Sequence, residues 1–218
     1  MVIEVSNRGQ IPVILGGDHS VTIGILGGMA KVKKMGLIYF DAHGDFNTTR
    51  TTLSYNVHGM GLAAVVGRGS PYLVNCVGIA PKVKEENAVL VGARDLDSAE
   101  KELLRESEVT VFTMDDIDKL GIHQVMEQAI EISSNGTEGV HISIDMDIVN
   151  PQEAPGVGTP VKGGLTYRET HMALEMVAEA DILASMDVME VNPILDCQNK
   201  TAELAVELIA STLGKRIF

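Results

Sequence analysis

The stretch Gly-Leu-Ile-Tyr-Phe-Asp-Ala-His-Gly-Asp-Phe-Asn at positions 36–47 decides the fold that the sequence predicts. Its apolar residues 37–40 are typical of a strand that a parallel sheet covers on both faces. Asp41, His43 and Asp45 follow at alternate positions. Such groups repel one another at the end of an apolar strand unless a cation lies among them. The stretch therefore predicts a site for Mn²⁺ or Zn²⁺, with a solvated acidic turn as the alternative.

Strands and helices alternate along the rest of the chain. We expect strands at 11–15, 37–40, 87–92, 109–112, 139–144 and 182–191, and helices at about 20–32, 60–66, 99–107, 115–133, 167–180 and 200–213. This order is typical of an α/β fold whose mostly parallel sheet has helices on both faces. The first two strands and their helix form a βαβ unit, which implies parallel pairing and a right-handed crossover. Ser98 is the expected N-cap of its helix, and residues 67–86 give no clear prediction.

Composition restricts the class of protein. The 218 residues fit one domain, 1–218, and 45% hydrophobic with 22% charged residues is a globular composition. A net charge of −13 argues against nucleic acid as a partner, because phosphates demand clustered Lys and Arg. The apolar runs are too short for a membrane span, and no signal sequence is recognisable. Two distant cysteines, Cys76 and Cys197, suggest a reducing compartment, so we expect a cytoplasmic protein.

Polar clusters follow most of the predicted strands. The residues concerned are Asp18 and His19 after the first, Asp95 and Asp97 after the third, Asp145 and Asp147 after the fifth, and Glu190 after the last. Ligands of parallel sheets bind beyond the carboxyl ends of the strands, where these clusters would meet. The predicted ligands then comprise two imidazoles and four carboxylates, from His19, Asp41, His43, Asp45, Asp145 and Asp147. One divalent ion rarely needs so many ligands, so we expect two ions that share carboxylates. Ions roughly 3.5–4 Å apart can share one water, lower its pKa and present hydroxide as a nucleophile.

Four motifs carry a resemblance to a known family. They are Gly-Gly-Asp-His-Ser at 16–20, Asp-Ala-His-Gly-Asp at 41–45, Ser-Ile-Asp-Met-Asp at 143–147 and Ala-Pro-Gly-Val-Gly-Thr-Pro at 154–160. In this order they resemble the ureohydrolases, the arginase and agmatinase superfamily. The loop 54–59, Arg94–Asp97 and the segment 190–201 make the chain most similar to the bacterial arginases. The resemblance covers essentially the whole chain.

The resemblance implies two Mn²⁺ ions per chain and hydrolysis of a guanidinium to urea and an amine. Carried over, one ion would be held by His19, Asp41, Asp45 and Asp145, and the other by Asp41, His43, Asp145 and Asp147. Asp41 and Asp145 would bridge the two ions. In the arginases the substrate is L-arginine and the amine is L-ornithine. Family members are usually trimers or hexamers, so a homo-oligomer is expected.

Further roles follow from the same resemblance. Glu190 would pair with the guanidinium, His58 would shuttle protons, and Asp147 would stabilise the reacting carbon and protonate the amine. The expected substrate contacts are Asn47, Thr52, Ser54 and Asn56 near the carboxylate, Asp97 and Glu100 near the α-amino group, and Thr159 near the reacting end. Taken alone, Asp97 and Glu100 equally suit the start of helix 99–107. His141, on a strand between Val140 and Ile142, is expected to be a structural hydrogen-bonding residue.

Three departures from the family pattern leave alternatives open. Complete members carry a strand–helix region before the point where this chain begins, so we expect the N-terminal edge of the sheet to be missing. Asn150 stands in place of an Asp, and Tyr55 stands in place of a Gly in the substrate loop. The alternatives are an agmatinase, another guanidino- or formimino-acid ureohydrolase, or a truncated, weakly active metal-binding homologue acting in assembly.

Overall fold

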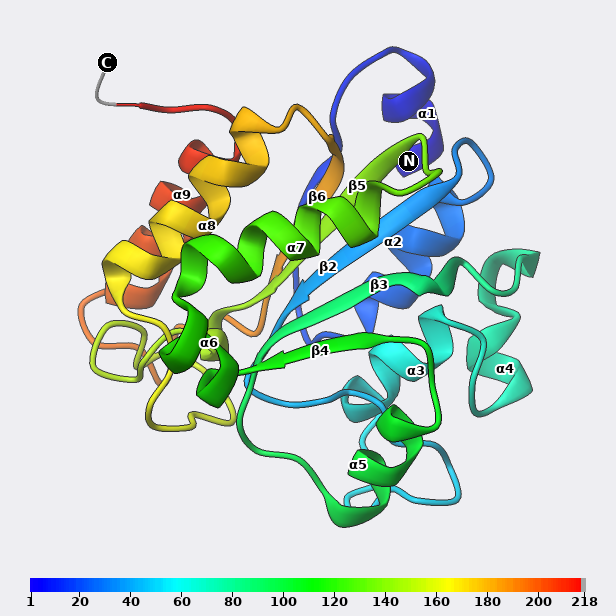
Figure 1. Ribbon diagram of the computed structural model, residues 1–218, viewed down its shortest axis with the longest axis horizontal. Coiled ribbons are helices and arrows are strands. Elements are labelled where there is room, and N and C mark those ends of the chain that lie inside the picture. The colour runs from blue at the N-terminus through cyan, green and yellow to red at the C-terminus, as the bar shows by residue number, and fades with distance from the viewer. Residues whose placement is uncertain (217–218) are drawn as a thin grey trace.

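A computed structural model describes residues 1–216; Figure 1 shows its helices on both sides of one sheet. Across these residues six strands pair in the order β1-β6-β5-β2-β3-β4, and every neighbouring pair is parallel. The strands are β1 (Val13–Leu15), β2 (Met35–Phe40), β3 (Val83–Ala93), β4 (Thr110–Thr113), β5 (Gly139–Asp145) and β6 (Leu183–Met189). The predicted parallel α/β sheet is therefore confirmed.

The helices that the structure describes connect these strands and cover both faces of the sheet. The α-helices are α1 (Val2–Asn7), α2 (Val21–Met29), α3 (Gly61–Val65), α4 (Pro71–Val74), α5 (Ser98–Arg105), α6 (Met114–Leu120), α7 (Ile122–Ser134), α8 (Tyr167–Glu179) and α9 (Lys200–Thr212). Short 3₁₀ turns form η1 (His58–Met60), η2 (Cys76–Gly78) and η3 (Met146–Ile148). None of the helices within residues 1–216 has both the length and the apolar character needed to cross a bilayer.

Strand β2 lies between two apolar clusters, which explains its uninterrupted apolar sequence. Leu37 and Tyr39 pack with α2 and α3 on one face of the sheet. Ile38 and Phe40 pack with α7, α8 and α9 on the other. Successive side chains of a strand point to opposite faces, so a strand covered on both sides requires apolar residues at every position. This burial holds the end of β2, and the polar residues after it, in a fixed place.

The first two strands are not neighbours, and the predicted direct pairing between them is wrong. β1 pairs with β6, whereas β2 pairs with β5 and β3. β5 and β6 therefore lie between the strands of the predicted βαβ unit, although all of these strands run parallel. A local sequence pattern identifies strands but does not specify which of them pair across the sheet.

Helix boundaries also differ from the prediction. The expected single helix over 115–133 is two helices, α6 and α7, because Gly121 between them has a φ of 80°. This left-handed conformation is readily adopted by glycine and cannot continue a right-handed helix. The unassigned segment 67–86 holds α4, η2 and the start of β3. Helix α1 was also not predicted.

Candidate metal centre and active site

The predicted metal ligands converge at the carboxyl edge of the sheet. Asp41 follows β2, and Asp145 ends the neighbouring strand β5. His19 follows β1, two strands further away, and reaches them because residues 16–20 pass over the end of β6. Gly16 donates its backbone N–H to β6 over 2.9 Å. A Cβ at Gly16 would lie 1.8 Å from the Sδ of Met189, so a larger residue there would displace the Met189 side chain.

One ligand group is arranged around the imidazole of His19. Its Nδ1 lies 2.9 Å from Oδ2 of Asp41, 3.4 Å from Oδ2 of Asp45 and 3.4 Å from Oδ2 of Asp145. The ligand atoms of His19, Asp41 and Asp45 lie within 4.8 Å of one another. The side chains of all four residues are almost completely buried. They are the same four residues that the resemblance assigns to one ion.

The second ligand group is arranged around His43. Its Nδ1 lies 3.3 Å from Oδ1 of Asp41 and 3.0 Å from Oδ2 of Asp147. These three side chains again offer ligand atoms within 4.8 Å of one another. Asp41 belongs to both groups, with one oxygen facing His19 and the other facing His43. A carboxylate placed in this way is suited to bridging two cations.

Electrostatics favours cations in this cluster. Burial, and then repulsion from neighbouring carboxylates, raises the pKa of Asp45, Asp145 and Asp147. Burial alone would lower the pKa of His43, but its contacts with Asp147 and Asp41 raise it to about 11. Protons bound to these side chains thus offset the negative charge of the carboxylates when no metal ion is bound. Carboxylate oxygens and imidazole nitrogens suit Mn²⁺ or Zn²⁺, so the donor set fits divalent metal ions.

A buried polar chain, which we call the Asp187 relay, lies behind His19 and consists of His19, Ser143, Asp187 and His141. Nε2 of His19 lies 2.8 Å from the Oγ of Ser143, which donates to Oδ1 of Asp187 over 2.8 Å. Oδ2 of Asp187 lies 3.0 Å from Nε2 of His141 and accepts from Thr22 over 2.8 Å. All five side chains are completely buried. The expected structural hydrogen bonding of His141 is therefore confirmed.

Asp187 was not among the predicted site residues, although the sequence of its strand contains one signal for it. Asp187 is the sole ionisable residue of β6, a strand that is apolar apart from Ser185 and Asp187 and is buried along most of its length. A buried carboxylate must find hydrogen-bond donors, and here it finds them in side chains of β5 and α2. A charged residue inside a buried strand is thus a sign of an internal polar network.

Glu190 and His58 face each other beside the ligand groups. Oε1 of Glu190 lies 3.5 Å from Nδ1 of His58 and accepts the backbone N–H of His19 over 2.9 Å. The contact with Glu190 raises the pKa of His58, although partial burial opposes the shift. Glu190 has a φ of 66°, a strained conformation for a residue with a side chain. The fold therefore holds an acid and a base in contact at this position.

A cavity of about 210 Å³ opens above the predicted metal ligands. It is lined by His43, Asp45, Asn47, Ser54, Asn56, His58, Gly59, Asp95, Asp97, Glu100, Asp145 and Thr159. Ten of these are predicted site residues; Gly59 and Asp95 are additional. Thr52 is outside this lining, and its hydroxyl accepts the backbone N–H of Tyr55 over 3.0 Å. Thr159 donates to Oδ2 of Asp147 over 3.2 Å, which connects the loop 154–160 with the second ligand group.

The far wall of the cavity is held by α5. Glu100 accepts the backbone N–H of Phe46 over 2.8 Å and that of Asp97 over 3.2 Å. Asp97, not Ser98, is the N-cap, because Asp97 and Glu100 form a capping box. The helix-start role of these acids is thus confirmed, and the prediction for Ser98 is wrong. Nδ2 of Asn47 donates to Asp97 over 3.0 Å, which leaves its buried Oδ1 without a described partner.

Arg94 is a second residue that the site prediction left out. Its Nη2 donates to the backbone oxygens of Asp147 over 2.6 Å and Val161 over 2.9 Å. Burial lowers the pKa of this guanidinium, while Asp147 and its neighbours oppose the shift. Arg94 thus joins β3 to Asp147, a predicted metal ligand, and to the loop that carries Thr159.

Comparisons with known proteins agree with this geometry. The Arginase family model matches residues 1–214. An arginase from Brevibacillus brevis is 52% identical over 218 residues, which are 100% of this chain and 73% of that protein. The solved arginase of Bacillus caldovelox superposes with a TM-score of 0.97 at 51% identity, covering 100% of this chain and 73% of that one. A solved agmatine ureohydrolase of Thermoplasma volcanium gives 0.77 at 26% identity, covering 98% and 64%.

Proposed function

We propose, from the premise that the chain belongs to the arginase family, that it hydrolyses L-arginine to urea and L-ornithine. The observation that carries this proposal is the cavity whose floor is the ligand cluster around Asp41 and whose far wall is the loop from Asn47 to Asn56 together with Asp97. The floor offers groups for the guanidinium end, and the far wall offers polar groups for an amino acid.

Two Mn²⁺ ions are the cofactors that we propose for the floor. His19, Asp41, Asp45 and Asp145 would hold one ion, and Asp41, His43, Asp145 and Asp147 the other. When bound, such ions supply a water of lowered pKa as a nucleophile at neutral pH. Support for this assignment comes from the buried acids, whose charge is unfavourable without cations, and from the position of Asp41 between the two histidines.

Residues of the chain supply binding and proton transfer. Glu190 would accept hydrogen bonds from the guanidinium and hold its carbon over the floor, which lowers the entropic part of the barrier. Asp147 is held by the hydroxyl of Thr159 and by the backbone N–H of Ala42. Its carboxylate would accept hydrogen bonds from the N–H groups that are bonded to the reacting carbon. His58 is 29% exposed and so can exchange protons between solvent and the leaving amine.

Selection of the substrate would take place at the far wall. Ser54 and Asn56 offer a hydroxyl and an amide donor to a carboxylate, and Asp97 offers an acceptor to an α-ammonium group. Agmatine has no carboxylate to satisfy these donors. Sites built to hydrogen-bond a substrate group discriminate strongly against the analogue without it. The wall therefore favours L-arginine over agmatine.

A comparison of substrates tests the proposal. Purified protein loaded with Mn²⁺ should release urea from L-arginine well above the rate from agmatine or guanidinobutyrate. Equal or reversed rates would leave the family assignment intact and sink the choice of L-arginine. Metal analysis of the same sample should give two Mn²⁺ per chain. A folded, metal-loaded protein without turnover would instead favour the second candidate, a metal-binding homologue that acts in assembly.

We also propose that the protein works in the cytoplasm as a homo-oligomer, a trimer or hexamer. The two cysteines are unpaired, and Cys197 is exposed, which suits a reducing compartment. Sedimentation of the metal-loaded protein tests the oligomeric state, and a monomer at working concentrations would contradict it.

A further inference from the structure

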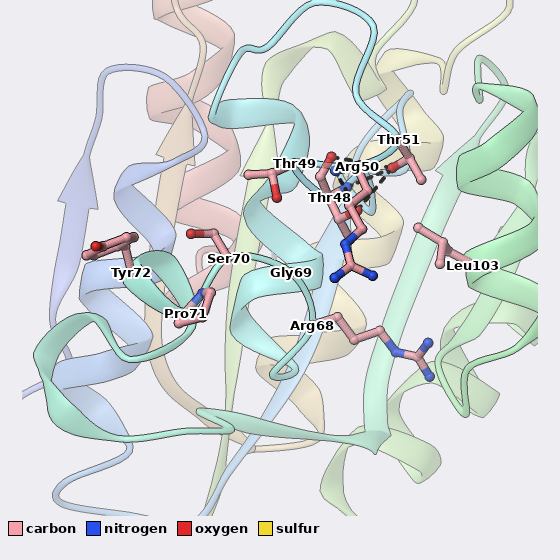
Figure 2. A pocket seen from close by; sticks show the side chains of 10 residues that line it. All are labelled: Thr48, Thr49, Arg50, Thr51, Arg68, Gly69, Ser70, Pro71, Tyr72 and Leu103. Atoms are coloured by element: carbon pink, nitrogen blue, oxygen red, sulfur yellow. Dashed lines mark hydrogen bonds between the residues drawn. The ribbon is translucent and has the colours of Figure 1, made fainter.

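A second, larger cavity of about 570 Å³ lies beside the active-site cavity. Figure 2 shows its lining, which consists of Thr48, Thr49, Arg50, Thr51, Arg68, Gly69, Ser70, Pro71, Tyr72 and Leu103. No residue of this lining also lines the active-site cavity. The segments 48–51 and 68–72 form two of its walls, and α5 forms the third through Leu103. We call this space the Arg50 pocket.

The charge of the Arg50 pocket is opposite to that of the whole chain. The chain has a net charge of −13, yet the lining contains two arginines and no Asp or Glu. The active-site cavity, by contrast, includes five acidic residues in its lining. A cavity that gathers cationic groups on an acidic protein is suited to an anionic ligand.

The two arginines differ in how far they are already neutralised. Arg68 donates through Nε and Nη2 to Glu85, and Nη2 also reaches the backbone oxygen of Glu106 over 3.2 Å. Arg50 forms no ion pair and no side-chain hydrogen bond with any residue in the range 1–216. In Figure 2 its guanidinium extends between the two walls of the cavity. Arg50 is therefore the free cation of this pocket among the described residues.

The remaining walls supply hydroxyl groups and apolar surface. Thr49 and Ser70 place hydroxyls on the side of the cavity opposite Leu103 (Figure 2). Pro71 and Tyr72 add apolar surface, and the ring of Tyr72 belongs to a side chain that is 91% exposed. A guanidinium binds carboxylate or phosphate through two parallel N–H bonds, and hydroxyls can add further donors.

We propose that the Arg50 pocket binds a small organic anion whose carboxylate or phosphate group is held by Arg50. The cavity volume falls within the range of small-molecule sites, about 300–1,000 Å³. Its apolar walls leave room for an organic body beside the anionic head. The segment 48–51 that lines the pocket belongs to the loop from Asn47 to Asn56, so the site shares this loop with the active-site cavity, although none of its lining residues is a proposed substrate contact.

Phenyl phosphate and benzoate are suitable probes, because each joins an aromatic body to one anionic head. Their binding to the Mn²⁺-loaded protein is measured by calorimetry for the wild type, Arg50→Gln and Arg105→Gln. Arg105 is the matched control: it is an exposed arginine of α5 that pairs with Glu102 outside this pocket. Attachment of a probe to the metal ions is common to all three proteins and cancels in the comparison.

The expected result is that Arg50→Gln weakens binding of at least one probe about tenfold, whereas Arg105→Gln leaves it unchanged. The probe with the larger loss identifies the preferred head group, carboxylate or phosphate. Benzyl alcohol, which has no charge, should bind none of the three proteins at the same concentrations. Equal affinity in the wild type and Arg50→Gln, or equal binding of benzyl alcohol and the anions, would overturn the proposal. The test requires no turnover, so it stands or fails separately from the proposed function.

Discussion

Ser143 donates its hydroxyl proton to Oδ1 of Asp187 over 2.8 Å, and the Oγ of Ser143 lies 2.8 Å from Nε2 of His19. Because its own proton goes to Asp187, Ser143 accepts the proton of His19 Nε2. Nδ1 of His19 then has its lone pair available for a metal ion among Asp41, Asp45 and Asp145. A metal-binding histidine commonly has its other nitrogen fixed in this way. The Asp187 relay thus selects the tautomer of His19 that can bind a cation.

Replacing Asp187 by Asn should weaken metal binding about 10–100-fold, because an amide offers Ser143 a poorer acceptor. Titration of metal-free protein with Mn²⁺ measures this loss without relying on turnover. Ser143→Ala should weaken binding in the same direction, since it removes the hydroxyl that links Asp187 to His19. Asp181→Asn, an exposed position, serves as the control. Wild-type Mn²⁺ affinity in both relay variants would show that the relay does not position His19.

Asp145→Asn should change stability in opposite directions with and without metal. Burial and the neighbouring acids raise the pKa of Asp145, so its carboxylate costs stability near neutral pH and Asn removes that cost. Metal-free Asp145→Asn should therefore unfold at a higher temperature than the metal-free wild type. With Mn²⁺ the order should reverse, because one ligand is lost. Calorimetric melting of both proteins, with chelator and with Mn²⁺, checks the reversal; a loss of stability in both conditions would contradict it.

The His58–Glu190 contact should make stability depend on pH. The pKa of folded His58 is raised above 6.5, mainly by Glu190. The contribution of protonated His58 to the free energy of unfolding is therefore complete below about pH 6.5 and is lost as the pH rises through the pKa of folded His58. Urea denaturation of the metal-free protein between about pH 6 and 9 should show this decline. Glu190→Gln should flatten the slope in that window, and an unchanged slope would mean that Glu190 does not raise the pKa of His58.

Tyr55→Gly should stabilise the fold by roughly 0.5–1 kcal/mol, the balance between relief of left-handed strain and the greater backbone freedom of glycine. Tyr55 has a φ of 62°, and its side chain is 78% exposed, so little packing is lost with the ring. The structure thus contains the strain expected where the family has glycine, although Tyr55 does not line the active-site cavity. Chemical denaturation measures the change. Tyr55→Ala keeps the Cβ and should bring no gain; an equal gain from both variants would assign the effect to the ring.

The site could be predicted more fully than the strand order. Asp41 and Asp145 follow apolar strands, and the ends of parallel strands meet at one edge whichever strands are neighbours. The positions of β5 and β6 between β1 and β2 depend on contacts between distant segments, which a local pattern does not contain. Asp187 was missed for the same reason, because its partners lie on other strands and helices. The break at Gly121 was visible as a glycine, yet the helical pattern on both sides concealed it.

Strand β1 is short and lies at the edge of the described sheet, so we expect the molecule to open first beside His19. Within residues 1–216, β1 spans only Val13–Leu15 and pairs with β6 alone, so few backbone hydrogen bonds retain it there. His19 follows it after three residues and contacts Asp41, next to the end of β2, and Ser143 of β5. Fraying of β1 would withdraw one ligand and leave the other five in place. Amide exchange along 13–19 and escape of one cation would then be the same kinetic event, with one shared rate constant.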